Sequence, residues 1–318
     1  MSWSRSGGFG HSSIRNLTML KIDNFSGGLL LVFAPFAWAS NIVVGRSLAG
    51  IVEPDLLNLM RWSGTALVLF PFVALQFRST AAAVKRSLPL LLSSGIVGLG
   101  LFQTMLYLAV SLTTATHAAT ALSLSPLVAM IVTRRAGVTA HVIWLGFAVS
   151  LVGVIIVQSD ALVGTQLDAK LILGDAIALG AALLWGAYNV LAAKLPKDIP
   201  PFTSLFVMSI AAMITSSLPV FARGDFHAIK SLTASAWLSV IYLVLVVSVM
   251  GLAAYNIGVR SLGAATGGLF IHLTPIFAVV LSFFVLGEHV RLIDGAGFMF
   301  VLVGLIIAMR KPMGPANL

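Results

Sequence analysis

One long apolar stretch occurs twice in this chain, and this duplication constrains the fold more than any other feature. The stretch from Ala264 to Met309 consists of two apolar segments, the first of which contains Thr-Pro at 274–275. A similar stretch runs from Ala115 to Val157 and contains Ser-Pro at 125–126, so the two prolines lie 149 residues apart. A repeat of this length has to be recognised before any single residue is interpreted.

Two further motifs extend the duplication over most of the chain. Gly146 and Gly297 occupy matching positions 151 residues apart, and an aromatic-Asn motif occurs around Trp38 and again, 147 residues later, around Trp185. We therefore interpret the chain as two copies of one structural unit. The predicted division is a polar cytoplasmic tail over residues 1–25, a first repeat over 26–158 and a second repeat over 173–310.

The composition indicates an integral membrane protein. Hydrophobic residues make up 59% of the chain, charged residues only 9%, and the mean hydropathy is +1.04. Several apolar runs approach the ~20 residues that a bilayer-spanning helix needs. The net charge of +9 does not indicate nucleic-acid binding, because the cations lie in loops between apolar runs. The absence of cysteine excludes disulfides and thiolate metal sites.

The apolar runs predict an all-α fold. They are continuously apolar without an alternation of period two, and helices satisfy their own backbone polar groups in lipid. Ten transmembrane spans are predicted, at roughly 26–47, 55–77, 88–109, 115–133, 141–158, 173–193, 201–222, 235–258, 264–286 and 292–309.

The distribution of Lys and Arg predicts the orientation. Thirteen of these cations lie in the tail and the even-numbered loops, against five in the other loops. This bias places both termini on the cytoplasmic side of a bacterial-type cell membrane. Because each repeat has five spans, an odd number, the second copy enters the membrane from the opposite face. Such inverted five-helix repeats are typical of secondary transporters, whose substrate site lies near the midplane between the halves.

Several motifs make the chain similar to the EamA domains of the drug/metabolite transporter superfamily. The motifs of the second copy are Gly174-Asp175, Leu184-Trp185, Thr274-Pro275, Leu286-Gly287-Glu288, Gly297 and Gly304. The first copy departs from this pattern, because residues 133–139 contain arginines and no Glu. The resemblance covers residues 28–310. It implies a permease or exporter, and it leaves the solute open among amino acids, nucleotide sugars, drugs and other metabolites.

The expected function is transport of a small metabolite, such as an amino acid or a drug-like solute, by alternating access. The expectation that the solute is exported rests on the resemblance alone. The expected partners are the solute and the lipid bilayer, with no cofactor, no metal and no nucleic acid, in a monomer or homodimer. Two alternatives remain, an integral membrane enzyme and a channel or non-transporting membrane partner. An enzyme would need clustered carboxylates or histidines, and no such motif is found.

Arg61 is the one Asp, Glu, Lys or Arg predicted well inside a span. It lies seven residues beyond Pro54, roughly 10 Å into the second span at helical rise. A central Arg costs about 2.5 to 3.5 kcal/mol on insertion scales, so something should compensate it. An anionic group of the solute would do so, and so would a structural pairing inside the protein.

Polar and aromatic side chains that share helix faces are the other candidates for contact with the solute. Residues three or four apart on a helix face the same way, and an aromatic ring beside a carboxamide suits a solute that is part apolar and part polar. Structural packing of the same residues is the alternative. The candidates that share a face are Trp38 with Asn41, Gln103 with Tyr107, and Trp185 with Tyr188 and Asn189. Tyr255 and Asn256 on the eighth span are added because they lie at a comparable depth.

Two prolines and one histidine complete the predicted site. Pro126 and Pro275 each lie eleven residues from the start of their span, where a proline kinks the helix, so we interpret them as gating residues. His272 is the candidate for a titratable group in the cavity, because imidazole changes charge near neutral pH. His117 lies near the outer end of the fourth span. Glu288, at a loop edge, is expected to cap a helix or pair with Arg291.

Overall fold

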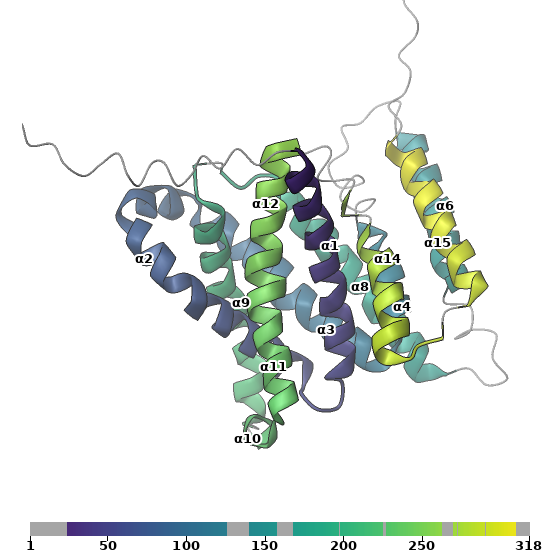
Figure 1. Ribbon diagram of the computed structural model, residues 1–318, viewed down its shortest axis with the longest axis horizontal. Coiled ribbons are helices and arrows are strands. Elements are labelled where there is room, and N and C mark those ends of the chain that lie inside the picture. Colours follow the sequence, from purple (N-terminus) through teal and green to yellow (C-terminus); the bar gives the residue numbers. More distant parts are fainter. Residues whose placement is uncertain are drawn as a thin grey trace, which may run out of the picture.

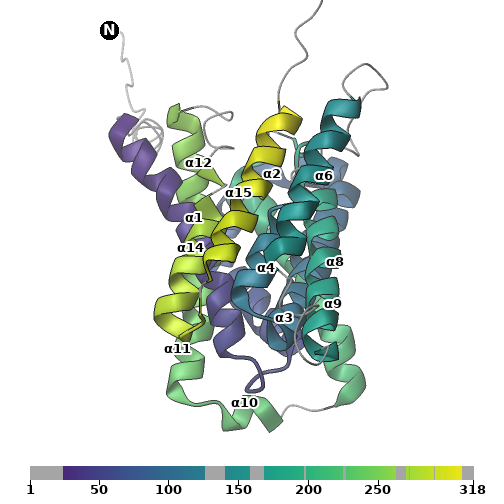
Figure 2. The ribbon, with the colours of Figure 1, turned by 90° about the vertical axis from the view of Figure 1, so that its right-hand side faces the viewer.

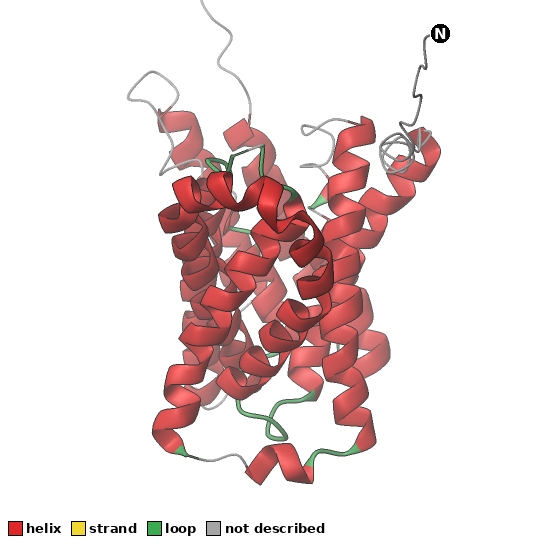
Figure 3. Cartoon of the chain, turned by 90° about the vertical axis from the view of Figure 1, so that its left-hand side faces the viewer, coloured by secondary structure: helices red, strands yellow, loops and turns green. Residues whose placement is uncertain are grey.

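The computed structural model shows a bundle of helices. It describes residues 24–125, 140–157, 168–196, 198–224, 227–262, 270–271, 273–289 and 291–309, and contains no strand in these ranges (Figure 3). Two of the predicted site residues, Pro126 and His272, lie outside the described residues.

The described helices of the first half overlap the predicted spans, although the fourth span, 115–133, lies partly outside the described residues. They are α1 (Asn24–Ser47), α2 (Pro54–Ser94), a π-helix η2 (Gly95–Leu101), α3 (Phe102–Leu112), α4 (Ala115–Leu122) and α6 (Ala140–Val157). The predicted loop over residues 78–87 is wrong, since α2 continues through it. This stretch contains neither glycine nor proline and includes a run of three alanines, which favours helix.

The second half contains a similar series of helices. They are α8 (Ala169–Ala192), α9 (Pro201–Arg223), α10 (His227–Ser231), α11 (Ala234–Tyr242), a π-helix η3 (Leu243–Met250), α12 (Gly251–Leu262), α14 (Leu273–Leu281), a π-helix η4 (Ser282–Leu286) and α15 (Leu292–Met309). Helix α10 was not predicted. The bounds of α9 and α15 agree with the predicted spans within one residue.

Six stretches of the described chain are helical, long and apolar enough to cross a membrane. They are Phe25–Ser47, Pro54–Gln76, Arg78–Leu112, Ala169–Ala192, Pro201–Arg223 and Ala234–Val259. Three shorter apolar helices accompany them, Trp144–Val157, Leu273–Leu286 and Leu292–Gly304. Many large apolar side chains on these helices are exposed, including Leu75, Phe284 and Leu238. Lipid is the solvent that suits such a surface.

The two halves of the chain interleave rather than forming separate domains. Helix α1 packs on α12 and α14, while α8 packs on α3 and α4. At the two flanks α2 packs on α9, and α6 packs on α15 (Figures 1 and 2). Helix α1 begins and α15 ends at the end of the bundle opposite α10 (Figure 1). We refer to the end where α10 lies as the α10 end.

Glycines allow α6 and α15 to approach closely. A Cβ atom added to Gly297 would lie 2.6 Å from the backbone oxygen of Gly153 and 2.7 Å from Cγ2 of Val157. A Cβ atom on Gly304 would collide with the backbone oxygen of Gly146 in the same way. Small residues at such contacts are typical of helix pairs in membranes, where close packing is a main source of association.

Two of the π-helices, η2 and η3, lie at corresponding positions of the two repeats, because they begin 148 residues apart in the chain. Such segments are rare and often lie at functional sites, because the wider turn displaces side chains and leaves backbone carbonyls without their usual partners. Asn58, fully buried on α2, donates from Nδ2 to the carbonyl oxygens of Leu99 and Gly100 in η2, both at 3.0 Å. The polar side chain therefore satisfies carbonyls of the π-helix.

Candidate functional site

Arg61 lies inside a buried polar cluster between α1, α2, α3 and η3. Only 4% of its surface is exposed. Its Nη1 donates to Oδ1 of Asn41 at 2.7 Å and to the hydroxyl of Tyr107 at 3.0 Å, and its Nε donates to Oγ of Ser248 at 2.9 Å. We call Asn41, Arg61, Tyr107 and Ser248 the arginine cluster. The structure thus brings together three of the predicted site residues, from α1, α2 and α3.

Ser248 was not predicted, and it enters the cluster because it belongs to π-helix η3. Its hydroxyl donates to the backbone oxygen of Leu243, five residues earlier, at 3.0 Å. It thereby presents its oxygen to Arg61 as an acceptor. The bond between Arg61 and Ser248 is the only one in the cluster that joins the two halves of the described chain.

No carboxylate pairs with Arg61 within the described residues. The charge is compensated by neutral oxygens and by the indole of Trp62, whose ring centroid lies 4.7 Å from the guanidinium carbon. Hydrogen bonds to a charged donor are worth about 1.5 to 3 kcal/mol each. The cluster therefore holds a buried positive charge that an anionic group could still neutralise.

Two aromatic contacts involve the predicted tryptophans. Trp38 on α1 lies against Tyr255 on α12 with ring centroids 5.4 Å apart. Trp185 on α8 lies 4.7 Å from Phe102 on α3 and stacks on Tyr188 at 4.7 Å. Each tryptophan therefore bridges the two halves of the chain through an aromatic partner.

The predicted carboxamides have unequal surroundings. Asn41 accepts two hydrogen bonds in the arginine cluster, whereas Asn256 donates to the backbone oxygen of Leu252 on its own helix at 2.9 Å. Gln103 is buried, and its Nε2 has no hydrogen-bond partner in the described chain. Asn189 is half-buried on α8. Of these side chains, only Asn41 belongs to the arginine cluster.

Pro275 stands near the start of α14 rather than in the middle of a continuous helix. A turn at Ile271 precedes α14, which begins at Leu273, and Pro275 is buried in its first turn. The hydroxyl of Thr274 is buried without a hydrogen-bond partner in the described residues. Helix α4 ends in a similar way at Leu122, before the Ser-Pro pair. The chain thus departs from regular helix just before each repeated proline.

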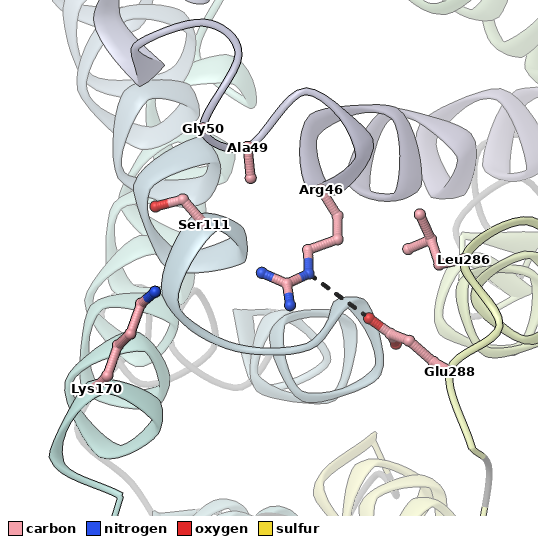
Figure 4. Close-up of a pocket in the computed structure, with 7 residues that line it drawn as sticks. All are labelled: Arg46, Ala49, Gly50, Ser111, Lys170, Leu286 and Glu288. Atoms are coloured by element: carbon pink, nitrogen blue, oxygen red, sulfur yellow. Dashed lines mark ion pairs between the residues drawn. The ribbon is translucent and has the colours of Figure 1, made fainter.

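A charged pocket opens at the α10 end of the bundle, away from the arginine cluster. It measures about 480 Å³ and is lined by Arg46, Ala49, Gly50, Ser111, Lys170, Leu286 and Glu288 (Figure 4). Nε of Arg46 lies 3.9 Å from Oε1 of Glu288, and its Nη1 donates to the backbone oxygen of Val110 at 2.8 Å. None of the predicted site residues is among those that line the pocket.

Glu288 caps a helix, as expected, but its cationic partner differs from the prediction. Its carboxylate accepts from the backbone N–H of Ala115 at 2.9 Å, at the start of α4, and pairs with Arg46. Of the two alternatives expected for Glu288, a cap or a pair with Arg291, the structure shows the cap. Arg291 instead pairs with Asp294 at 2.6 Å and donates to the backbone oxygen of Val157.

The chain belongs to the EamA-like transporter family, whose model matches residues 25–159 and 172–310. This confirms the resemblance inferred from the motifs. The protein is accordingly a multi-pass membrane transporter, in keeping with its apolar helices.

Curated relatives carry consistent names. "Uncharacterized transporter YyaM" of Bacillus subtilis is 24% identical over 67% of this chain and 70% of its own length. An "Uncharacterized transporter" of Clostridium kluyveri is 24% identical over 88% of this chain and 92% of its own length. "Uncharacterized inner membrane transporter YedA" of Escherichia coli is 25% identical over 63% of this chain and 64% of its own length.

A solved crystal structure of a protein shares the fold. It matches with a TM-score of 0.55 at 19% identity and covers 89% of this chain and 96% of the other. This likeness extends over nearly the full length of both chains.

Proposed function

We propose that the protein exports a small metabolite across the cytoplasmic membrane by alternating access, with ten spans arranged as two inverted repeats. The observation that carries the proposal is the exchange symmetry of the contact between α6 and α15. Gly153 approaches Gly297, and Gly146 approaches Gly304. Gly146 corresponds to Gly297 and Gly153 to Gly304 in the two repeats. Exchanging the repeats therefore converts the first contact into the second.

The packing of other helices supports the same symmetry. Interchanging the repeats converts the contact between α1 and α12 into that between α8 and α3. The π-helices η2 and η3 correspond under the same exchange. Two halves of opposite orientation can rock about a site between them, which is the usual basis of alternating access in such transporters.

The arginine cluster supplies the proposed site for a charged group of the solute. Arg61 keeps its bonds to Asn41 and Tyr107 within the first half, while its bond to Ser248 connects the halves. When the halves separate, the guanidinium loses Ser248 and gains access to the solute. A carboxylate or phosphate of the solute then replaces the serine oxygen, which provides the differential binding that a conformational change requires.

The charged pocket supplies the outer opening of the proposed pathway. Its cations, Arg46 and Lys170, and its carboxylate, Glu288, offer groups of both signs to a solute that leaves the cluster. This arrangement suits a small solute with both an acidic and a basic group, such as an amino acid. The aromatic contacts of Trp38 and Trp185 lie on the two helices that join the halves and suit the apolar part of such a solute.

Efflux of a labelled metabolite mixture tests the proposed function without a guess about the solute. Proteoliposomes are loaded with the ¹³C-labelled small-molecule fraction of a bacterial extract, and mass spectrometry follows which compounds leave. We expect at least one small acidic or zwitterionic compound to leave faster than from protein-free vesicles, with saturable counterflow. If every compound leaves both kinds of vesicle at the same rate, the protein is not the proposed carrier.

Cysteine labelling tests the proposed orientation, and the natural absence of cysteine makes it clean. Lys85 and Lys194 are exposed at the predicted cytoplasmic end, and Lys170 and Lys230 are exposed at the α10 end. In whole cells, an impermeant maleimide added outside should label single cysteines at 170 and 230 and leave those at 85 and 194 unlabelled until the cells are opened. The opposite pattern would contradict cytoplasmic termini.

A further inference from the structure

A buried histidine and aspartate form a pair that the transport pathway described above does not use. Nδ1 of His117 on α4 lies 3.0 Å from Oδ1 of Asp175 on α8, and the hydroxyl of Thr113 donates to the same carboxylate oxygen at 2.5 Å. His117 is 3% exposed and Asp175 is 6% exposed. The pair joins a helix of the first half to a helix of the second half, as the Arg61–Ser248 bond does.

Gly174 explains why this pair forms. A Cβ atom at Gly174 would lie 2.8 Å from the backbone nitrogen of Thr113 and 2.9 Å from the carbonyl carbon of Leu112. Only glycine allows the start of α8 to approach the end of α3 so closely. The next residue, Asp175, is thereby placed beside Thr113 and His117.

A second pocket gives the pair access to the α10 end of the bundle. It measures about 340 Å³, and His117 is part of its lining. Ionisable side chains of several helices and loops surround the histidine. They are Asp175 on α8, Glu288 and His289 in the segment after η4, Arg291 before α15, Asp294 on α15, and, behind Glu288, Arg46 on α1.

We propose that the His117–Asp175 pair is a proton-binding site that couples export of the solute to entry of a proton. The proposal rests on the transport function proposed above. A proton from water in the second pocket binds the imidazole, whose charge rises to +1, and no other bond forms or breaks. When the halves rearrange, the proton leaves toward the cytoplasm, so one proton enters for each solute exported.

The charge balance of the pair explains why proton binding affects the conformation. With the imidazole protonated, the pair is a neutral, hydrogen-bonded ion pair that ties α4 to α8. With the imidazole neutral, the buried carboxylate keeps its hydrogen bond from Thr113 but loses the cationic partner within the pair, which is costly in a protein interior. Arg46, the nearby cation on α1, is paired with Glu288. Protonation therefore stabilises the contact between the two halves, and deprotonation weakens it.

Gradient-driven transport tests the proposal with the same ¹³C-labelled metabolite mixture. Proteoliposomes contain the pH indicator pyranine and are clamped with potassium and valinomycin. For one coupled proton, a gradient of one pH unit sustains about a tenfold ratio of solute across the membrane. We expect the parent protein to reach about this solute concentration ratio, with the solute moving in the direction opposite to the protons. His117→Gln should abolish the ratio and the linked proton entry while counterflow continues.

His289→Gln is the matched control, because His289 lines the same pocket but is exposed and lies outside the buried pair. It should keep the parental ratio. Asp175→Asn provides a second variant, since it removes the charge and keeps an oxygen for Thr113. It should also lose the gradient-driven ratio.

Each other outcome is decisive. Parental counterflow that does not respond to a pH gradient would overturn the coupling and leave the carrier function intact. Full coupling in His117→Gln would overturn the assignment of the site. Loss of counterflow together with coupling in both His117→Gln and Asp175→Asn would show that the pair is structural. Absence of counterflow in the parent would instead contradict the proposed function.

Discussion

Gly297→Leu is expected to prevent α6 and α15 from packing and to yield protein that does not survive purification. A Cβ atom at this position would lie 2.6 Å from the backbone oxygen of Gly153. A backbone oxygen cannot turn aside as a side chain can, so the two helices must separate along their length. Overpacking of a well-packed interior costs typically about 1 to 3 kcal/mol and occasionally more. Size-exclusion chromatography of a fluorescent fusion in mild detergent measures the loss of the monodisperse peak.

Gly295→Leu is the matched control for this prediction. Gly295 lies two residues earlier on the same helix, and a Cβ atom there meets no heavy atom within 4 Å. This variant should elute and melt like the parent, since it changes helix propensity in the favourable direction. Equal elution and equal melting of Gly297→Leu and Gly295→Leu would mean that the contact between α6 and α15 does not hold the fold together.

Much of the helix arrangement follows from the sequence, because long apolar runs leave few alternatives in lipid. The bounds of α9 and α15 were predicted within one residue, since each helix is bordered by proline, glycine or charge. Part of the arginine cluster also followed. Arg61 was expected to need compensation, and its neighbours Asn41 and Tyr107 were among the candidates for contact with the solute.

The rest depended on features that local patterns do not record. No sequence rule reveals the wider turns of η2 and η3, so Ser248 was missed as a partner of Arg61. The pairs of His117 with Asp175 and of Arg46 with Glu288 join residues far apart in the chain, and single sequences contain no signal for such distances. The continuity of α2 was missed because three cations suggested a loop, whereas cations near a membrane surface are compatible with helix.

Arg61→Met is expected to fold and insert normally but to lose about ten- to a hundredfold in transport rate. The fold should survive because both principal partners keep another hydrogen bond. Oδ1 of Asn41 still accepts from Tyr107 at 2.9 Å, and Ser248 still donates to the backbone of Leu243 at 3.0 Å. Removal of the charge also relieves an insertion cost of about 2.5 to 3.5 kcal/mol.

The loss of rate follows from the proposed exchange of partners at the guanidinium. A charge-assisted hydrogen bond to an anionic solute is worth about 1.5 to 3 kcal/mol, and each 1.4 kcal/mol changes a rate about tenfold. Arg61→Lys keeps a positive charge and should retain part of the rate. Its single ammonium nitrogen cannot reproduce the contacts that Nε and Nη1 make to α1, α3 and η3.

Counterflow in proteoliposomes, normalised to the amount of folded protein, measures the effect, with Arg78→Met as the matched control. Arg78 lies on the same helix and is exposed, so its loss should leave both folding and counterflow at parental values. Parental counterflow in Arg61→Met would mean that the buried charge serves packing alone. Loss of folding in Arg61→Met would mean that the remaining hydrogen bonds do not sustain the cluster, and that Arg61 is needed to hold α1, α2, α3 and η3 together before any solute binds.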